Sequence, residues 1–163
     1  MTEGLRKVAR ILLHTGDTPH RTALAFGVGV FIAFSPFLGI HMWIALLIAI
    51  LFRLNRVAIL AGTYLNNPWT FAPMYLAGTS FGCFLLGRPF DGLSAIDWSL
   101  HGRAFYRQVW HVLSRYGKPF LLGNTILGLM CAALGYLLLR RIIEHRRAAA
   151  AREAAVSAAA PPA

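Results

Sequence analysis

The chain has 163 residues and a formal net charge of +10; 57% of its residues are hydrophobic and 13% are charged. Soluble globular domains carry about 25% charged residues, so this composition argues against an ordinary soluble domain. The basic residues flank apolar runs and the motifs of nucleic-acid-binding domains are absent. We therefore expect anionic lipid head groups, and no nucleic acid, to be the partners of the positive charge.

Three long runs contain no Lys, Arg, Asp or Glu. The first two have 31 residues each, between Arg21 and Arg53 and between Arg56 and Arg88, and the third covers residues 119–139. About 20 helical residues cross the hydrocarbon of a bilayer. The runs predict an all-α, multi-pass membrane protein.

In chain order, residues 1–17 form a basic segment in which Leu5, Val8 and Leu12 share one helical face. This pattern predicts an amphipathic helix over residues 2–14 that rests on the membrane surface. The apolar core of a cleavable signal peptide is missing here, so we expect the first long run to act as an uncleaved insertion signal.

Residues 18–87 are predicted to form two blocks of broken helices. Thr18 before Pro19 is typical of a helix start, and the same cap-plus-proline pattern recurs at Ser35-Pro36 and Asn67-Pro68. A straight helix of 31 residues would be about 46 Å long, against a hydrocarbon core of about 30 Å. We therefore expect helices over residues 19–34, 36–52, 56–65 and 68–87, in hairpins or re-entrant segments. The two blocks resemble each other weakly, since Gly27 and Gly62 occupy equivalent positions after the arginine that begins each block. One interpretation is therefore a duplicated helical hairpin.

Residues 88–118 are predicted to be an interfacial amphipathic segment. Arg103, Arg107, His111 and Arg115 recur every four residues, among several aromatic side chains. Such a helix is typical of a membrane surface, where Arg103, Arg107 and Arg115 would face lipid head groups. A helical linker packed on the rest of the protein is the alternative.

Residues 119–141 are predicted to be a transmembrane helix, since glycines at 123, 128 and 135 allow close packing. The Ala-rich basic tail, residues 142–163, should continue this helix for a few turns and then become disordered. Basic clusters at both ends of the chain predict cytoplasmic termini and an even number of crossings. The first block would return as a hairpin, and the second block and the last helix would cross outward and back.

The polar residues at the helix breaks have a structural and a functional interpretation. Asn67 can cap the helix that follows it, and Asn66 can bond the last carbonyl groups of the preceding helix. Helix N-termini at Pro36 and Pro68 also suit an anion, and all six acidic residues lie outside the uncharged runs. His41 is an ionisable residue inside the first run, which makes it a functional candidate. The predicted substrate-binding residues are Ser35, Pro36, His41, Asn66, Asn67, Pro68, Arg53 and Arg56.

No catalytic group, metal site or cofactor is predicted. Nucleophile constellations and clustered metal ligands are absent from the sequence, and Cys83 and Cys131 each stand alone in an apolar run. We interpret both cysteines as reduced packing residues. The chain is therefore predicted not to be an enzyme, with an intramembrane lipid-modifying enzyme as the remote alternative.

Several stretches together carry a family resemblance: TPHR at residues 18–21, AFGVGVF at 25–31, SPFLGIH at 35–41, LN at 54–55 and GTYLNNPWT at 62–70. They resemble the bacterial membrane family called domain of unknown function 2062 (DUF2062), strongly over residues 19–87. The resemblance implies a multi-pass protein of the bacterial inner membrane and supplies no catalytic residues. Some relatives look joined to glycosyltransferase domains, so a glycosyltransferase-type partner and a homo-oligomer are both open.

The functional hypothesis from the sequence is an integral membrane protein that binds or translocates an anionic lipid or solute at its helix breaks. The alternative is a membrane scaffold or assembly factor whose breaks only shape the fold. The first hypothesis requires the two breaks to meet around a polar cavity, whereas the second predicts tight packing between them.

Overall fold

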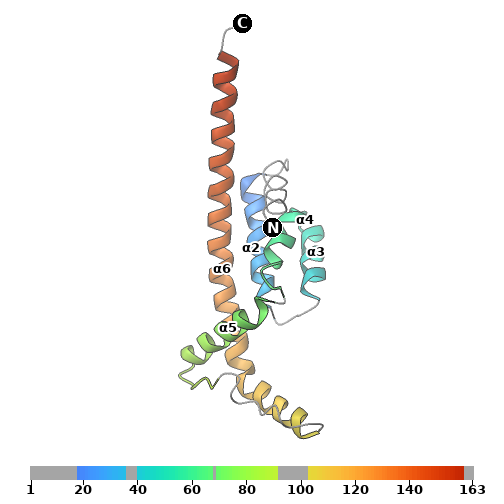
Figure 1. The fold of residues 1–163 in the computed structure, drawn as a ribbon. Helices are drawn as coiled ribbons and strands as arrows, with labels where there is room; N and C mark the ends of the chain where they lie inside the picture. The colour runs from blue at the N-terminus through green and yellow to red at the C-terminus, as the bar shows by residue number, and fades with distance from the viewer. Residues whose placement is uncertain (1–17, 36–39, 68, 92–102, 160–163) are drawn as a thin grey trace.

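A computed structural model describes residues 18–35, 40–67, 69–91 and 103–159 of the chain. All regular structure in these residues is helical: α2 (Pro19–Ala33), α3 (His41–Leu51), α4 (Arg56–Thr63), α5 (Phe71–Leu85) and α6 (Arg103–Ala159). The prediction of an all-α fold is confirmed for this part of the chain. Figure 1 shows α2, α3 and α4 beside one another on one side of α6, with α5 crossing α6 below them. The helix predicted over residues 2–14 lies outside the described residues.

Two of the helix starts follow directly from their capping residues. The Thr18 hydroxyl oxygen accepts a hydrogen bond from the Arg21 backbone N–H (3.3 Å), and Pro19 is the first residue of α2. This start was predicted from the sequence and is confirmed. At α4 the Asn55 side-chain oxygen accepts from the Ala58 N–H (3.0 Å). Both caps pair N–H groups that a helix leaves open at its first turn.

The helices α3 and α5 end in the same backbone motif. At the end of α3 the Leu54 N–H donates to the Ala49 carbonyl (2.8 Å), and Arg53 between them has a φ of 52°. At the end of α5 the Arg88 N–H donates to the Cys83 carbonyl (2.9 Å), and Gly87 has a φ of 61°. This left-handed cap normally uses glycine, so arginine at position 53 is an exception with an energetic cost.

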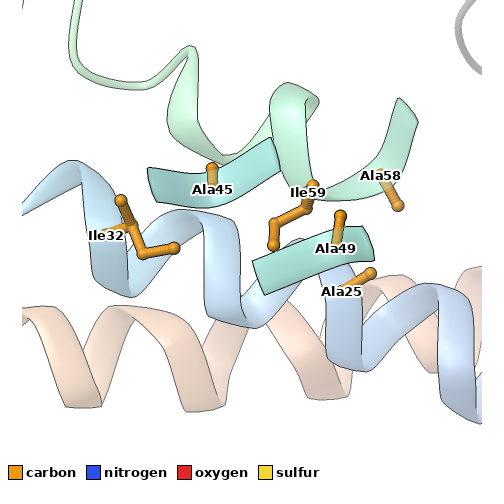
Figure 2. Packing of buried hydrophobic residues seen from close by; sticks show 6 residues of the cluster. All are labelled: Ala25, Ile32, Ala45, Ala49, Ala58 and Ile59. Atoms are coloured by element: carbon orange, nitrogen blue, oxygen red, sulfur yellow. The ribbon is translucent and has the colours of Figure 1, made fainter. Parts of the chain in front are cut away.

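The core between α2, α3 and α4 is made mainly of small side chains. Figure 2 shows the cluster of Ala25, Ile32, Ala45, Ala49, Ala58 and Ile59. Gly29 of α2 and Gly62 of α4 bring two backbones into contact, because a Cβ on Gly62 would lie 2.3 Å from the Phe26 carbonyl oxygen. Small residues at helix crossings are typical of membrane proteins, in which close van der Waals packing stabilises helix pairs.

Glycines also form the crossing of α5 over α6. A Cβ on Gly82 would lie 1.8 Å from the Pro119 carbonyl oxygen, and one on Gly123 would lie 1.9 Å from the Gly78 carbonyl oxygen. Neither position can hold a side chain without a backbone shift. Of the three glycines of α6 for which the sequence predicted close packing, Gly123 packs against α5, and Gly128 and Gly135 face Phe34 and Phe26.

Residues 103–118 of the segment predicted as interfacial and the helix predicted from residue 119 form one continuous helix, α6, of 57 residues. Pro119 lies inside it, where the missing N–H leaves the Arg115 carbonyl without its helical partner. Figure 1 shows α6 changing direction in this region, as expected at an internal proline. As expected, the helix continues into the tail, and it ends at Ala159; the residues after it lie outside the described part of the chain.

The two proline breaks start their helices later than predicted. α3 begins at His41 and α5 at Phe71, whereas the sequence predicted starts at Pro36 and Pro68. Pro36 and Pro68 themselves lie outside the described residues. At the second break a turn capped by Asn67 precedes α5, so the capping residue acts before the regular helix begins.

Among the described residues, α6 is the one helix long and apolar enough to cross a membrane. Its candidate span covers Ser114–Arg152, and only 11% of its most apolar window is buried. The helices α3 and α5 are apolar but shorter.

Candidate functional site

The two helix breaks meet in space through Asn66 and Tyr75. The Asn66 amide nitrogen donates to the Ala33 carbonyl at the end of α2 (2.8 Å) and to the Tyr75 hydroxyl (3.1 Å). The Tyr75 hydroxyl in turn donates to the Ser35 carbonyl (2.6 Å). The last carbonyls of a helix have no partner within the helix, and this network supplies partners for α2. Asn66 thus donates to a carbonyl at the end of α2. The sequence predicted instead a bond to the last carbonyls of the helix that directly precedes Asn66.

Asn67 and Thr70 close the turn that leads into α5. The Asn67 side-chain oxygen accepts from the backbone N–H groups of Trp69 (2.9 Å) and Thr70 (3.1 Å). The Thr70 hydroxyl accepts from the Asn67 N–H (3.1 Å) and donates to the Leu65 carbonyl. An anion at this terminus would have to displace the Asn67 cap, because the cap already occupies the N–H groups that an anion would use.

His41 is the first residue of α3 and is 8% exposed. Its Nδ1 atom is buried and has no hydrogen-bond partner among the residues that the structure describes. The preceding residue, Ile40, provides no side-chain cap for α3. His41 stays a candidate on the ground of this unpaired nitrogen.

An arginine cluster lies at the opposite end of α2 from the helix breaks. The Arg21 guanidinium donates to the Arg53 carbonyl (2.7 Å), so the start of α2 contacts the end of α3. Arg56 follows as the first residue of α4, and all three side chains are exposed. A helix of 15 residues is about 22 Å long, so Arg53 and Arg56 are separated from Ser35 and Asn66 by the length of α2.

Arg140 of α6 lies at the same end of the molecule, near the start of α2. The ring nitrogen Nδ1 of His20 lies 2.8 Å from the Tyr136 hydroxyl, which accepts from the Arg140 guanidinium (3.2 Å). Arg140 also pairs with Glu144 (2.8 Å). We call Arg21, Arg53, Arg56, Arg140 and Arg141 the arginine end.

The basic stripe predicted on residues 103–115 is exposed at Arg103, Arg107 and Arg115. Arg115 lies 3.5 Å from the Asp91 carboxylate and over the Tyr116 ring, whose hydroxyl donates to the same carboxylate (3.2 Å). Part of this charge is therefore neutralised within the protein. The contact of the stripe with lipid stays a prediction.

A pocket of about 220 Å³ lies between the end of α2 and α6. Its walls are the side chains of Phe31, Phe34, Phe120 and Leu121, together with the polar residues Ser35, Asn124 and Thr125. The Asn124 amide nitrogen donates to the Phe120 carbonyl (2.9 Å), while Asn124 Oδ1 and Ser35 Oγ are buried without a partner in the described part of the chain.

The residues singled out from the sequence therefore separate into two places. Ser35 and Asn66 come together at the breaks, with Asn67 in the adjoining turn, while Arg53 and Arg56 lie at the arginine end. Tyr75, Asn124 and Arg21 were missed as site residues. A signal existed for Asn124, because it is a strongly polar residue inside the uncharged run 119–139.

No group of three His, Cys, Asp or Glu side chains that could hold a metal occurs in the residues with described positions. Cys83 is buried and Cys131 is half-buried, both as free thiols.

Comparison with known proteins identifies a family. No curated protein and no solved structure matches the chain. A family model described as "Uncharacterized protein conserved in bacteria (DUF2062)" matches residues 4–152. This match covers most of the chain, includes both helix breaks and the arginine end, and confirms the resemblance seen in the sequence. The protein belongs to this bacterial family, DUF2062.

Proposed function

We propose that the protein is an integral protein of the bacterial inner membrane that binds anionic lipid head groups at the arginine end. The proposal combines an apolar surface, a helix arrangement that matches a bilayer, and an arginine held in an unfavourable backbone conformation. The last of these is the observation that carries it.

The exposed apolar surface supports insertion into a bilayer. In α3, Trp43 and Leu51 are each 71% exposed. Further large apolar side chains exposed on α6 are Leu121, Leu122, Leu129, Met130, Leu134, Leu137 and Leu138. A soluble protein rarely exposes contiguous apolar patches of this extent, and the core helix of a soluble protein would be mostly buried.

The helix lengths and directions support a topology with a re-entrant hairpin. The uncharged part of α6, residues 119–139, is about 31 Å long, close to the thickness of hydrocarbon. α2 and α3 run antiparallel and are only about 22 Å and 16 Å long, so this pair would enter from the arginine end and return. α4 and α5 would cross together, and α6 would cross back. Both termini then lie on the side of the arginine end, which the positive-inside rule assigns to the cytoplasm.

Arg53 is the residue that points to an anion. α5 ends in the same motif with Gly87, whereas α3 holds an arginine at the left-handed position. A residue with a Cβ pays roughly 1 kcal/mol there, so a function of the side chain explains its presence better than stability does. Among the described residues of this end, Glu144 is the acidic side chain, and it is paired with Arg140. The guanidinium groups of Arg21, Arg53 and Arg56 thus present uncompensated positive charge beside apolar helices, which is what an anionic head group requires.

The test is lipid retention by the purified protein. Native mass spectrometry would compare phosphatidylglycerol with phosphatidylcholine on the wild type and on the triple variant Arg21→Gln, Arg53→Gln, Arg56→Gln. We expect the wild type to prefer phosphatidylglycerol and the triple variant to lose most of that preference. The matched control removes the same charge elsewhere, by Arg88→Gln, Arg103→Gln and Arg107→Gln. Loss of the preference only in the control variant would move the lipid site to the start of α6 and overturn the proposal.

The membrane scaffold stays as the second candidate because of the last part of α6. Figure 1 shows this part running past α2, α3, α4 and α5, and residues 144–152 are exposed. An exposed basic helix is available to a cytoplasmic partner, such as a glycosyltransferase-type protein or a second copy of the chain. Deletion of residues 145–163 should abolish partner capture in this case and leave lipid preference unchanged.

A further inference from the structure

We propose that the protein thins the bilayer beside α3 and α4 and lets phospholipids change leaflets there. This inference rests on the insertion into a bilayer proposed above, and it concerns the side of the molecule that faces away from α6. The substrate is a phospholipid of any head-group charge, which moves in either direction without an energy source.

The apolar surface of α3 and α4 is short. On α3 it runs from the exposed Trp43 to Arg53, which is ten residues or about 15 Å. On α4 it runs from Arg56 to the exposed Tyr64, which is eight residues or about 12 Å. Aromatic residues such as Trp and Tyr are typical of the level where hydrocarbon meets water, and arginine heads reach for the same kind of level. This side of the protein therefore matches a hydrocarbon layer of about 12–15 Å.

The opposite side of the protein matches a layer about twice as thick. The uncharged residues 119–139 of α6 measure about 31 Å, and Leu121, Leu129 and Leu137 are exposed along this length. Figure 1 shows α2 between α6 and the pair of α3 and α4, so surfaces of two different lengths face lipid on two sides of one molecule. A bilayer adapts to a short apolar surface by thinning locally, at a modest cost for each ångström.

The helix breaks lie inside the length of α6 rather than at its edge. A Cβ on Gly128 would lie 2.8 Å from the Phe34 Cβ, and Ser35 and Asn124 line the same pocket. Asn124 and Gly128 follow Lys118 by six and ten residues, which is about 9 and 15 Å along α6. The end of α2 is thus separated by this distance from the membrane surface that Lys118 marks.

Polar groups reach the molecular surface at this depth. Asn66 bonds the end of α2, so the chain segment 64–70 lies at the same level. Within this segment Tyr64 and Thr70 are exposed, and Trp69 is 89% exposed. Polar groups in contact with hydrocarbon are costly, whereas a thinner bilayer would bring water and head groups to them at a smaller cost.

Thinning shortens the path of a head group between the leaflets. A head group at the level of Trp69 has about 12–15 Å of apolar surface to cross before it meets Arg53 and Arg56, compared with about 31 Å along α6. The cost of a charge in the membrane falls where the bilayer is thin and water enters it. At the inner end of the path the arginines attract the phosphate group.

The experiment measures lipid exchange between leaflets in phosphatidylcholine vesicles that contain the full-length protein. A short-chain fluorescent phosphatidylcholine is present in both leaflets, and serum albumin extracts only the molecules in the outer leaflet. We expect the inner-leaflet label to become extractable at least roughly tenfold faster than in protein-free vesicles, because a rate depends exponentially on its barrier. Albumin is too large to pass a small membrane defect, so leakage does not imitate this result.

The double variant Tyr64→Leu, Trp69→Leu tests the aromatic end of the short surface. Leucine extends the apolar surface past the breaks, so the bilayer should thin less and the exchange rate should fall about threefold or more. Both side chains are exposed, and the Trp69 N–H that bonds Asn67 belongs to the backbone and is unchanged. Trp110→Leu is the matched control, because Trp110 is also exposed but lies on the first part of α6, and it should keep the rate. If the double variant does not fold, the two single variants decide the question.

Three results would overturn the inference: exchange no faster than in protein-free vesicles, a double variant as fast as the wild type, or a Trp110→Leu variant as slow as the double variant. The triple arginine-to-glutamine variant separates the two proposals. Glutamine keeps this end of the surface polar, so the variant should lose its phosphatidylglycerol preference and still exchange phosphatidylcholine faster than protein-free vesicles do. Absent exchange with a normal phosphatidylglycerol preference would refute only the inference, whereas a protein that does not insert into vesicles would refute both proposals.

Discussion

Asn66 donates a hydrogen bond to the carbonyl of Ala33, 33 positions earlier in the chain, at 2.8 Å. This bond connects the two helix breaks that the sequence places in separate apolar runs. Tyr75 completes the connection by donating to Ser35 and accepting from Asn66. Backbone carbonyls in an apolar environment need partners, and here a side-chain amide and a phenol provide them.

The first prediction concerns the coupling between these two side chains. Asn66→Ala should lower the free energy of unfolding in detergent by about 1–3 kcal/mol, because it leaves the Ala33 carbonyl unpaired. Tyr75→Phe keeps the ring contacts with Phe71 and Phe120 and removes only the hydroxyl. A double-mutant cycle should give a coupling energy above about 0.5 kcal/mol. Asn67→Ala is the control: it loses a cap worth about 1 kcal/mol but should not couple to Tyr75→Phe. Additive effects of Asn66→Ala and Tyr75→Phe would contradict the network.

The second prediction concerns the crossing of α5 and α6. Gly123→Ala should destabilise the protein by about 3 kcal/mol or prevent folding, because the new Cβ would meet the Gly78 carbonyl. Gly117→Ala, in the same helix, has nothing within 4 Å of the new Cβ. It should stabilise the protein by up to about 1 kcal/mol through better helix propensity. Thermal unfolding of both variants in detergent checks this, and similar values for the two would be evidence against the packing of α5 on α6.

The third prediction separates stability from lipid binding at Arg53. Arg53→Gly should raise the free energy of unfolding by up to about 1 kcal/mol, since glycine adopts the left-handed cap without a steric penalty. The bond from Arg21 uses the backbone carbonyl of residue 53 and therefore persists. Preference for phosphatidylglycerol should fall in the same variant. Arg56→Gly is the control. It should lower the free energy of unfolding, because it places glycine in the first turn of α4. A less stable Arg53→Gly variant with normal lipid preference would contradict the role of Arg53.

The fourth prediction compares the same change in two surroundings. Tyr136→Phe removes a hydroxyl that bonds His20 and Arg140 at an exposed position. The free energy of unfolding should therefore change by less than about 0.5 kcal/mol. Tyr75→Phe removes a hydroxyl from a half-buried network and should cost about 1–2 kcal/mol. Thermal unfolding measured side by side is the test. A larger loss of stability in Tyr136→Phe than in Tyr75→Phe would mean that contacts at the arginine end, rather than those at the breaks, hold the helices together.

Local sequence signals predicted the elements well where a cap sits directly at a helix start. Thr18-Pro19 marked the beginning of α2. Asn67 was expected to cap the next helix, but it caps the turn before α5, and Thr70 at the start of α5 makes no side-chain cap bond. The same reasoning placed the starts of α3 and α5 too early, because a proline marks where a helix can begin and does not oblige it to begin there. Pro119 was taken as the start of a helix, but α6 continues through it. Gly78 and Gly82 of α5 pack closely against Pro119 and Gly123 of α6 at this point.

The sequence by itself determined the all-α class, the uncharged lengths of helix and the family, because these depend on composition, on spacing along one chain and on local motifs. Only the tertiary structure decided that Asn66 bonds the end of α2, that Arg53 and Arg56 lie a helix length away from the breaks, and that Ser35 and Asn124 line one pocket. The physical reason is that side-chain partners across 30 to 120 positions of chain depend on how glycine and alanine surfaces let the helices approach. Periodicity along a single helix carries no information about which neighbour will lie against it.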